Sequence, residues 1–150
     1  MMVTDPAPAE YGYVLDNLRA KSAEELAALG GTPEHVKAMI AQTPYKWVVY
    51  SGAYPAAVIG WTPMRRGVLS LFGFGTDDWI KVWRRVTLIA KKDMIMAGES
   101  AGWHRAQAIS PAWHEDTHKW LRLIGATHEA ELPAYGVNAE DFIMFSWFRK

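Results

Sequence analysis

The sequence predicts an α/β protein in which a mixed sheet is flanked by helices. Apolar residues recur every three or four positions in some segments, as on one face of a helix, and alternate or run continuously in others, as in strands. The two kinds of segment follow each other along the chain, an order typical of layered α/β structures. Half of the 150 residues are apolar and 13% are aromatic, which is enough for a well-packed core.

The first forty residues predict short helices. Ser22, with Glu25 three positions later, forms a capping box, which opens a short helix that ends at Gly30. Thr32 and Pro33 then start the next helix, as its N-cap and its first helical residue.

The middle of the chain predicts a hairpin, a further strand and a long helix. Residues 46–61 are rich in β-branched and aromatic side chains, and Ser51-Gly52 divides them into two strands. Residues 67–75 form the further strand, and the next helix is capped within residues 76–78. That helix carries an apolar stripe, which consists of Trp79, Val82, Trp83, Val86, Ile89, Ala90 and Met94.

The last third of the chain predicts a strand, a helix and two more strands. Residues 103–110 read as the strand, and residues 111–124 read as a helix closed by Gly125. Residues 127–136 and 141–150 are the final strands. The last strand is apolar on both faces, so we expect it in the interior of the sheet.

Composition excludes several classes of function. Lys and Arg together number 16, as do Asp and Glu, so no long-range attraction to nucleic acid or a membrane surface is expected. Without cysteine, the chain has no disulfide, thiol chemistry or cysteine metal site. No apolar run reaches the ~18 residues that span a bilayer, and the start lacks the regions of a signal peptide. We expect a soluble, cytoplasmic-type protein with an extended lead-in over residues 1–10 and one domain over 11–150.

Residues 114–118 read HEDTH, which matches the H-E-x-x-H pattern of zinc metalloproteases. The pattern would place His114 and His118 on one helical face with a glutamate as general base. The extended form of the motif needs a third histidine where Ile124 stands. His114 also falls in an acidic first turn of the kind that a helix N-terminus favours. We therefore interpret both histidines as part of a helix start and predict no metal site.

The order of the elements and the late helix resemble the GNAT acetyltransferases. In GNAT proteins this helix carries an aromatic residue and a tyrosine ahead of a Gly-Phe pair. The segment HEDTHKWLRLIGA is similar, with Trp120, Leu121 and Gly125-Ala126 at those positions. The resemblance implies a GNAT-like mixed sheet flanked by helices and, in an active member, acetyl-CoA as the cofactor.

A closer resemblance is to a family of small tailed-phage proteins that look GNAT-like and are related to the gene-13 protein of short-tailed coliphages. The stretches that carry it are NLRAKSAEELAALG, YPAAVIGW, GFGTDDWIKVWRR, HKWLRLIGATHEAELPAYG and EDFIMFSW. The resemblance implies a role in virion morphogenesis, with other phage virion or assembly proteins as partners. It also implies a location in the host cytoplasm during assembly and in the virion.

Two chemical parts of a GNAT enzyme are altered in this sequence. The loop that holds the coenzyme diphosphate corresponds to Gly73-Phe74-Gly75-Thr76, and Asp77-Asp78 follow where N–H donors and positive charge are needed. Leu121 replaces the tyrosine that protonates the leaving thiolate. If the chain is active, Tyr135 could serve as the acid and Glu129 as the base.

We therefore expect a degenerate GNAT-like domain with no bound cofactor and no enzymatic activity. It would act in virion assembly, or as a minor internal virion component, through protein contacts. Trp79, Trp83 and Trp113 are the candidate contact surface, because tryptophan is enriched in interface hot spots, and core packing is the other interpretation of these residues. The alternative function is an active acetyl-CoA-dependent N-acetyltransferase that modifies a host or phage protein.

Overall fold

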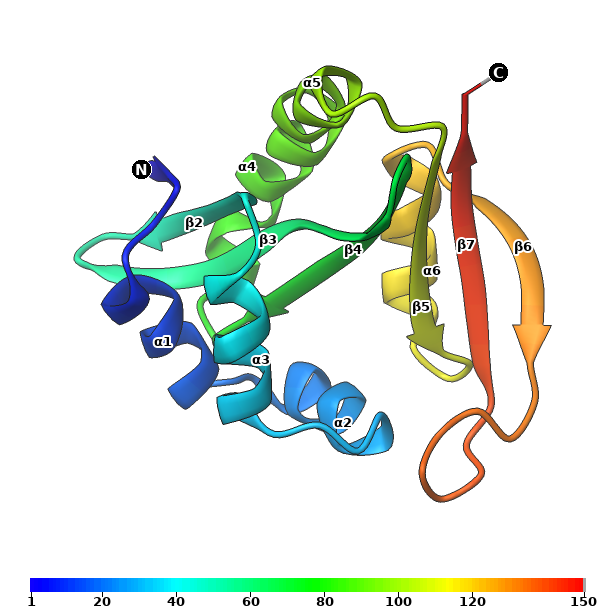
Figure 1. Cartoon of the computed structure of the whole chain (residues 1–150). Coiled ribbons are helices and arrows are strands. Elements are labelled where there is room, and N and C mark those ends of the chain that lie inside the picture. Colours follow the sequence, from blue (N-terminus) through cyan, green and yellow to red (C-terminus); the bar gives the residue numbers. More distant parts are fainter. Residues whose placement is uncertain (150) are drawn as a thin grey trace.

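The computed structural model describes residues 1–149, which form a seven-stranded mixed sheet and six helices (Figure 1). The strands are β1 (Met2–Thr4), β2 (Tyr45–Ser51), β3 (Tyr54–Arg65), β4 (Val68–Gly75), β5 (Arg105–Pro111), β6 (Thr127–Leu132) and β7 (Phe142–Phe148). The helices are α1 (Pro8–Asp16), α2 (Ala20–Ala28), α3 (Pro33–Ala41), α4 (Trp79–Lys91), α5 (Asp93–Ser100) and α6 (Glu115–Leu123). The strand order is β1-β2-β3-β4-β5-β7-β6, and only the β4–β5 pair is parallel among these described strands.

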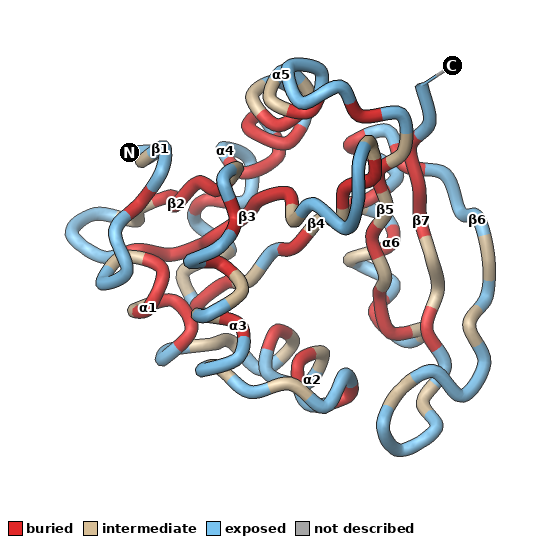
Figure 2. The backbone as a smooth tube through the Cα atoms, in the orientation of Figure 1, coloured by how far each residue is buried: buried red, intermediate tan, exposed pale blue. Residues whose placement is uncertain are grey.

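Helices cover both faces of the sheet. On one face α1, α2 and α3 pack against Val48, Val58 and Phe72, and on the other α4, α5 and α6 pack against a larger cluster that includes Trp47 and Ile59. Side chains of a strand alternate between its two faces, so Trp47 and Val48, neighbours in β2, belong to opposite cores. Both are buried, as Figure 2 shows for most of β2 and β3. This two-sided burial explains the continuous apolar runs in the sequence.

The sheet divides between β4 and β5. These strands pair over three positions only, from Val68 with Arg105 to Ser70 with Gln107. Beyond them β4 continues to Gly75 along β3, while β5 continues to Pro111 along β7. The sheet therefore consists of two wings, β1 to β4 and β5 to β7, which diverge beyond their short junction (Figure 1).

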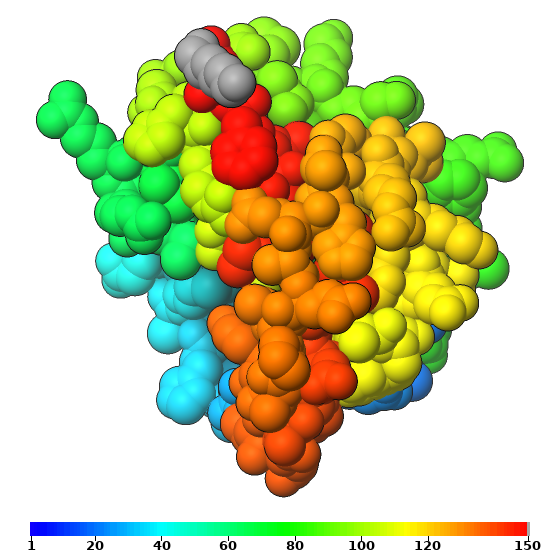
Figure 3. Space-filling model, turned by 90° about the vertical axis from the view of Figure 1, so that its right-hand side faces the viewer, coloured from blue at the N-terminus to red at the C-terminus, as the bar shows by residue number. Residues whose placement is uncertain are grey.

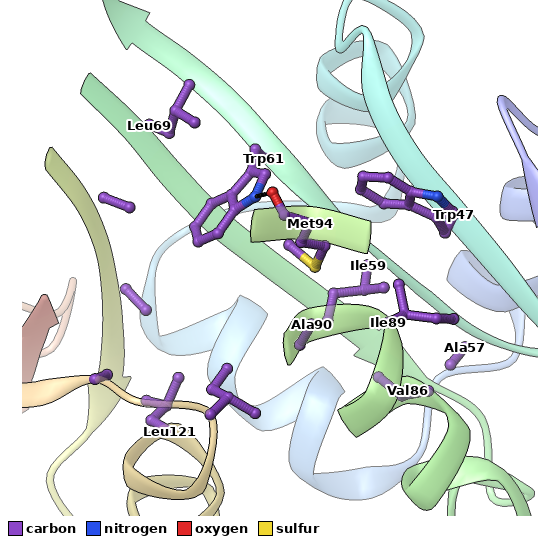
Figure 4. Close-up of a cluster of buried hydrophobic side chains, with 14 of the residues drawn as sticks. Trp47, Ala57, Ile59, Trp61, Leu69, Val86, Ile89, Ala90, Met94 and Leu121 are labelled. Carbon is purple, nitrogen blue, oxygen red and sulfur yellow. Dashed lines mark hydrogen bonds between the residues drawn. The ribbon is translucent and has the colours of Figure 1, made fainter. Parts of the chain in front are cut away.

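Two tryptophans pack against each other where the wings join. Trp61 of β3 meets Trp147 of β7 edge to face, with ring centroids 5.6 Å apart. Each indole N–H has a backbone acceptor: Trp61 donates to Met94 O at 2.8 Å (Figure 4), and Trp147 donates to Ile124 O at 3.1 Å. A buried indole needs such a partner, so this contact fixes α5 and the end of α6 at the junction as well.

The predicted α/β layers and the mixed sheet are confirmed, and so are the hairpin at Ser51-Gly52 and the interior place of the last strand. The long helix predicted after residue 76 is interrupted at Lys92, whose φ of −120° and ψ of −70° separate α4 from α5. The predicted lead-in over residues 1–10 contains β1, which pairs with β2, and the first turn of α1. Across residues 1–149, no helix combines the length and the apolar character that crossing a membrane requires.

Truncation of Phe145 tests the packing of the second wing. Phe145 of β7 is fully buried, whereas Phe148 on the same strand is 61% exposed. We expect Phe145→Ala to lower the free energy of unfolding by about 3–5 kcal/mol, because it removes a large side chain and leaves a cavity. Phe148→Ala should change it by less than ~1 kcal/mol. Urea denaturation measures both, and equal losses would contradict this assignment of the core.

Candidate active site

A cavity of about 860 Å³ lies where β4 and β5 diverge, and we call it the splay cavity. Its walls are residues 70–75 of β4, Ala108 and Ile109 of β5, side chains of α2 and α3 on one face of the sheet, and side chains of α4 and α6 on the other. Because both helical layers line it, the cavity passes through the sheet between the two wings. Most of its lining is apolar, so a few polar groups determine its chemistry.

The edge of β4 offers unpaired backbone groups to the splay cavity. Thr76 N donates to Ala56 O of the neighbouring strand, whereas Gly75 N donates to Ser22 Oγ and Gly75 O accepts from Arg19 N. Successive residues of a strand direct their N–H and C=O groups to opposite sides. Leu71 and Gly73 therefore face away from β3, toward β5. The Leu71 N–H belongs to the last β4–β5 pair, Ser70 with Gln107, so the groups left facing the gap are the Leu71 C=O and both the N–H and C=O of Gly73. An extended ligand could pair with this edge as an added strand.

The N-terminus of α2 is tied to the end of β4. Arg19 is the N-cap of α2, and its backbone N–H and the Ser22 hydroxyl hold Gly75 by the two bonds just described. The absence of a side chain at Gly75 leaves room for Trp79 of α4, because a Cβ there would lie 2.9 Å from the Trp79 ring. The capping box predicted from Ser22 and Glu25 is therefore wrong: α2 begins at Ala20, and Ser22 caps a strand end 53 positions away.

Glu25 lies one turn after Ser22 and lines the splay cavity. Burial raises the pKa of Glu25 to about 7, and the positive charge of Arg19 opposes part of this rise. Among the described residues, its carboxyl group has no hydrogen-bond or salt-bridge partner. A carboxyl group that titrates near neutral pH inside a cavity is suited to accept a proton in catalysis.

The sequence did predict glutamates as bases, but not this one. Its signal was present: Ser22, Glu25, Leu26 and Leu29 follow the i, i+3, i+4, i+7 spacing of one helical face. A carboxylate beside buried residues of one helical face, here Ser22 and Leu26, is rarely structural unless it is paired. The capping-box interpretation concealed this position by giving Glu25 a local partner.

Polar side-chain contacts connect α2 with the start of α6 beside the splay cavity. Lys21 Nζ lies 3.0 Å from Asp116 Oδ2, and the carboxylate of Glu24 accepts from Trp113 Nε1 and lies 3.2 Å from His114 Nε2. The hydrogen bond from Trp113 lowers the pKa of Glu24. These contacts join the two wings on the side of α2.

The predicted cofactor residues divide into two groups. Gly73, Phe74 and Gly75 belong to β4 and line the splay cavity. Thr76 does not: its amide is bound to Ala56 O, and its hydroxyl accepts from Asp78 N at 3.2 Å.

The turn between β4 and α4 consists of residues 76–78, without glycine and with two aspartates. The strand edge and cavity therefore fit the extended arm of an acyl thioester. The turn does not fit a diphosphate, because its backbone offers no cradle and its carboxylates repel one.

Neither of the predicted acid–base residues lines the splay cavity. Glu129 of β6 forms a bidentate salt bridge with Arg105, at 2.7 and 2.8 Å, which lowers the pKa of Glu129. Tyr135 follows β6, is 51% exposed and packs on Phe142. Both lie on β6 and its loop, which form the outer surface of the second wing, in orange in Figure 3. Leu121, which replaces the GNAT tyrosine, is buried and does line the cavity.

The HEDTH segment begins α6. His114 is the N-cap residue and faces Glu24, whereas His118 Nε2 lies 2.9 Å from Pro111 O, so the two rings serve different partners. Burial lowers the pKa of His118. Within residues 1–149, no three His, Cys, Asp or Glu side chains gather in the manner of a metal site.

The three predicted contact tryptophans do not form one patch. Trp79 lines the splay cavity and packs on Trp120, with ring centroids 6.1 Å apart. Trp83, one turn later, is 37% exposed and also lines the cavity. Trp113 is 46% exposed, and its Nε1 donates a hydrogen bond to the Glu24 carboxylate.

The fold is that of the GNAT acetyltransferases. Ribosomal-protein-alanine N-acetyltransferase from Brucella melitensis matches with a TM-score of 0.78 at 14% identity, over 99% of each chain. Ard1 from Thermoplasma volcanium also has a TM-score of 0.78, at 10% identity, over 100% of this chain and 97% of its own. The putative acetyltransferase yncA from Salmonella typhimurium, solved with acetyl-CoA, has a TM-score of 0.74 at 15% identity, over 98% of this chain and 93% of its own. No protein-family model matches the chain, and no curated protein does.

These comparisons confirm the GNAT-like fold and correct the expected function. The main hypothesis, a degenerate domain that acts in virion assembly, is contradicted because the similar structures are acetyltransferases. Two of them contain acetyl-CoA or CoA, so the expectation of no cofactor has no support either. The resemblance to phage proteins and the phage partners stay predictions.

The unusual pKa of Glu25 has a measurable effect on stability. Because the folded-state pKa lies above the ordinary value of 4.5, protonated Glu25 stabilises the fold at low pH, and this contribution is lost as the pH rises to about 7. The free energy of unfolding of Glu25→Gln should therefore increase relative to that of the wild type as the pH rises from 4.5 to about 7. Above pH 7 the difference between the two proteins should stay constant. Urea denaturation at pH 4.5, 6 and 8 measures the difference, and a constant difference would contradict a raised pKa.

Proposed function

We propose that this protein is an N-acyltransferase that moves an acyl group, acetyl in the simplest case, from a coenzyme A thioester to an amine. The observation that carries the proposal is Glu25, a carboxyl group with a pKa of about 7 inside a cavity between diverging strands. The GNAT fold supports the choice of donor, because similar structures hold acetyl-CoA or CoA.

The donor arm fits the edge of β4. The N–H and C=O groups of Gly73 and the C=O of Leu71 can pair with the amides of an extended pantetheine arm, and the apolar walls exclude water from the thioester. The turn at residues 76–78 contributes little to binding of the coenzyme diphosphate, so we expect the pantetheine arm to provide most of the binding free energy. Bound in this way, the thioester supplies the acyl group and takes the departing electron pair on sulfur.

Glu25 removes the proton that the acceptor must lose. A protonated amine has no lone pair, so the amine reacts in its neutral form and then sheds a proton as the C–N bond forms and the C–S bond breaks. Ionised Glu25 accepts that proton. Leu121 cannot donate one to sulfur, but a thiol with an ordinary pKa of about 8.5 can leave as a thiolate and take its proton from water.

Substitution of Glu25 tests the base directly. We expect Glu25→Gln to lower kcat by about 10²- to 10⁴-fold. In the wild type, kcat/KM expressed per concentration of neutral amine should rise with pH and reach half its maximum near pH 7, because only ionised Glu25 accepts a proton, and the variant should lack this rise. Acetyl-CoA consumption with an amine panel measures both.

Glu34→Gln is the matched control, since Glu34 is an exposed glutamate in the first turn of α3. A Glu25→Gln enzyme as active as this control would exclude Glu25 as the base.

A further inference from the structure

Arg19 has an unused binding capacity at the splay cavity. Its guanidinium carbon lies 4.9 Å from the centroid of the Trp79 ring, which holds the side chain against the start of α4. Its Nε is sealed from solvent and, among the described residues, has no hydrogen-bond partner. No carboxylate of residues 1–149 is within salt-bridge distance of it. Arginine donors normally find carboxylate or phosphate oxygens, and a buried donor without one is costly.

The surrounding charges favour a carboxylate over a diphosphate. Burial lowers the pKa of Arg19, while the carboxylates of Glu25, Asp116 and Asp77 lie near enough to oppose that effect. Of these, Asp116 is already paired with Lys21. A diphosphate would add further negative charge beside them, whereas a zwitterion adds none. Its cationic end would also be attracted by the same carboxylates that repel a diphosphate.

Glu25 and Arg19 are placed to hold the two ends of one small molecule. Both line the splay cavity, and both belong to the start of α2. They are too far apart for a salt bridge, yet each shifts the pKa of the other through its charge. An α-amino acid carries a cationic amino group and a carboxylate on the same carbon, so it presents an opposite charge to each of these two side chains.

The cavity wall beyond Glu25 is apolar. Leu26 of α2, Val36 and Met39 of α3, and Phe72 of β4 line it, and three of these are more than nine-tenths buried. A ligand side chain that follows this wall would be hydrophobic.

We propose that the acceptor is a free α-amino acid with an apolar side chain, whose carboxylate binds Arg19 and whose amino group lies beside Glu25. This inference rests on the proposed acyl transfer and specifies its substrate. The ammonium group first loses one proton to water. The neutral nitrogen then attacks the thioester carbonyl carbon, the C–N bond forms as the C–S bond breaks, and the second proton passes from nitrogen to Glu25. The thiolate takes a proton from water, and the products are an N-acyl amino acid and a free thiol.

The test compares leucine with leucinamide, which keeps the amine and side chain but lacks the carboxylate. For the wild type we expect transfer to leucine with a lower KM than to leucinamide. Arg19→Gln should raise KM for leucine by about 10- to 100-fold, the effect of losing a charge-assisted bond, and leave KM for leucinamide unchanged. Arg19→Lys, which keeps the charge, should recover part of the loss. Arg66→Gln, at an exposed position of the turn between β3 and β4, is the control.

Three results would overturn the proposal. In the first, Arg19→Gln raises KM for leucine and leucinamide alike and weakens acetyl-CoA binding in calorimetry without acceptor, which would assign Arg19 to the donor. In the second, only peptides or proteins are acylated. In the third, leucine fails to bind the wild type in a calorimetric titration. A fourth outcome separates the two proposals. If leucine binds the wild type but not Arg19→Gln, and no amine is acylated, the amino-acid site is supported and the proposed acyltransferase function is refuted.

Discussion

The parallel pairing of β4 with β5 stops after three positions, and the rest of the candidate site depends on that limit. Each strand then follows a different antiparallel partner, β3 or β7, so the sheet cannot close again. The Trp61–Trp147 contact secures the junction where pairing is short. The unpaired edge of β4 and the cavity through the sheet are consequences of the same divergence, and both would vanish if the pairing continued to Gly75.

The start of α2 gives the cavity its chemistry. Two hydrogen bonds fix the helix against the end of β4. Arg19 N donates to Gly75 O, and Gly75 N donates to Ser22 Oγ. Helical spacing then places Glu25 in the cavity, where burial raises its pKa to about 7. Arg19, at the same anchor point, supplies the opposite charge. One short helix therefore positions both ionisable groups on which the proposed acceptor chemistry relies, while β4 provides the donor edge.

Much of the fold could be predicted from sequence, because apolar periodicity and turn residues act locally. The alternation in residues 46–61 and the Ser51-Gly52 turn specify the hairpin, and apolar residues on both faces of β7 indicate its interior position. The site could not be predicted in the same way. Ser22 and Glu25 have the spacing of a capping box, and only the fold reveals that Ser22 binds Gly75 instead. The aspartates at residues 77 and 78 bear on how a diphosphate would be held, whereas the expected lack of activity rested on them and on Leu121 without regard to the cavity or Glu25.

The central claim is that the β4 edge in the splay cavity binds the arm of an acyl thioester. The most direct measurement is ¹⁵N NMR of the uniformly labelled protein during titration with acetyl-CoA. The account predicts that the amide signal of Gly73 shifts most and that this amide becomes protected from exchange with solvent. An unchanged Gly73 signal at millimolar acetyl-CoA would contradict it.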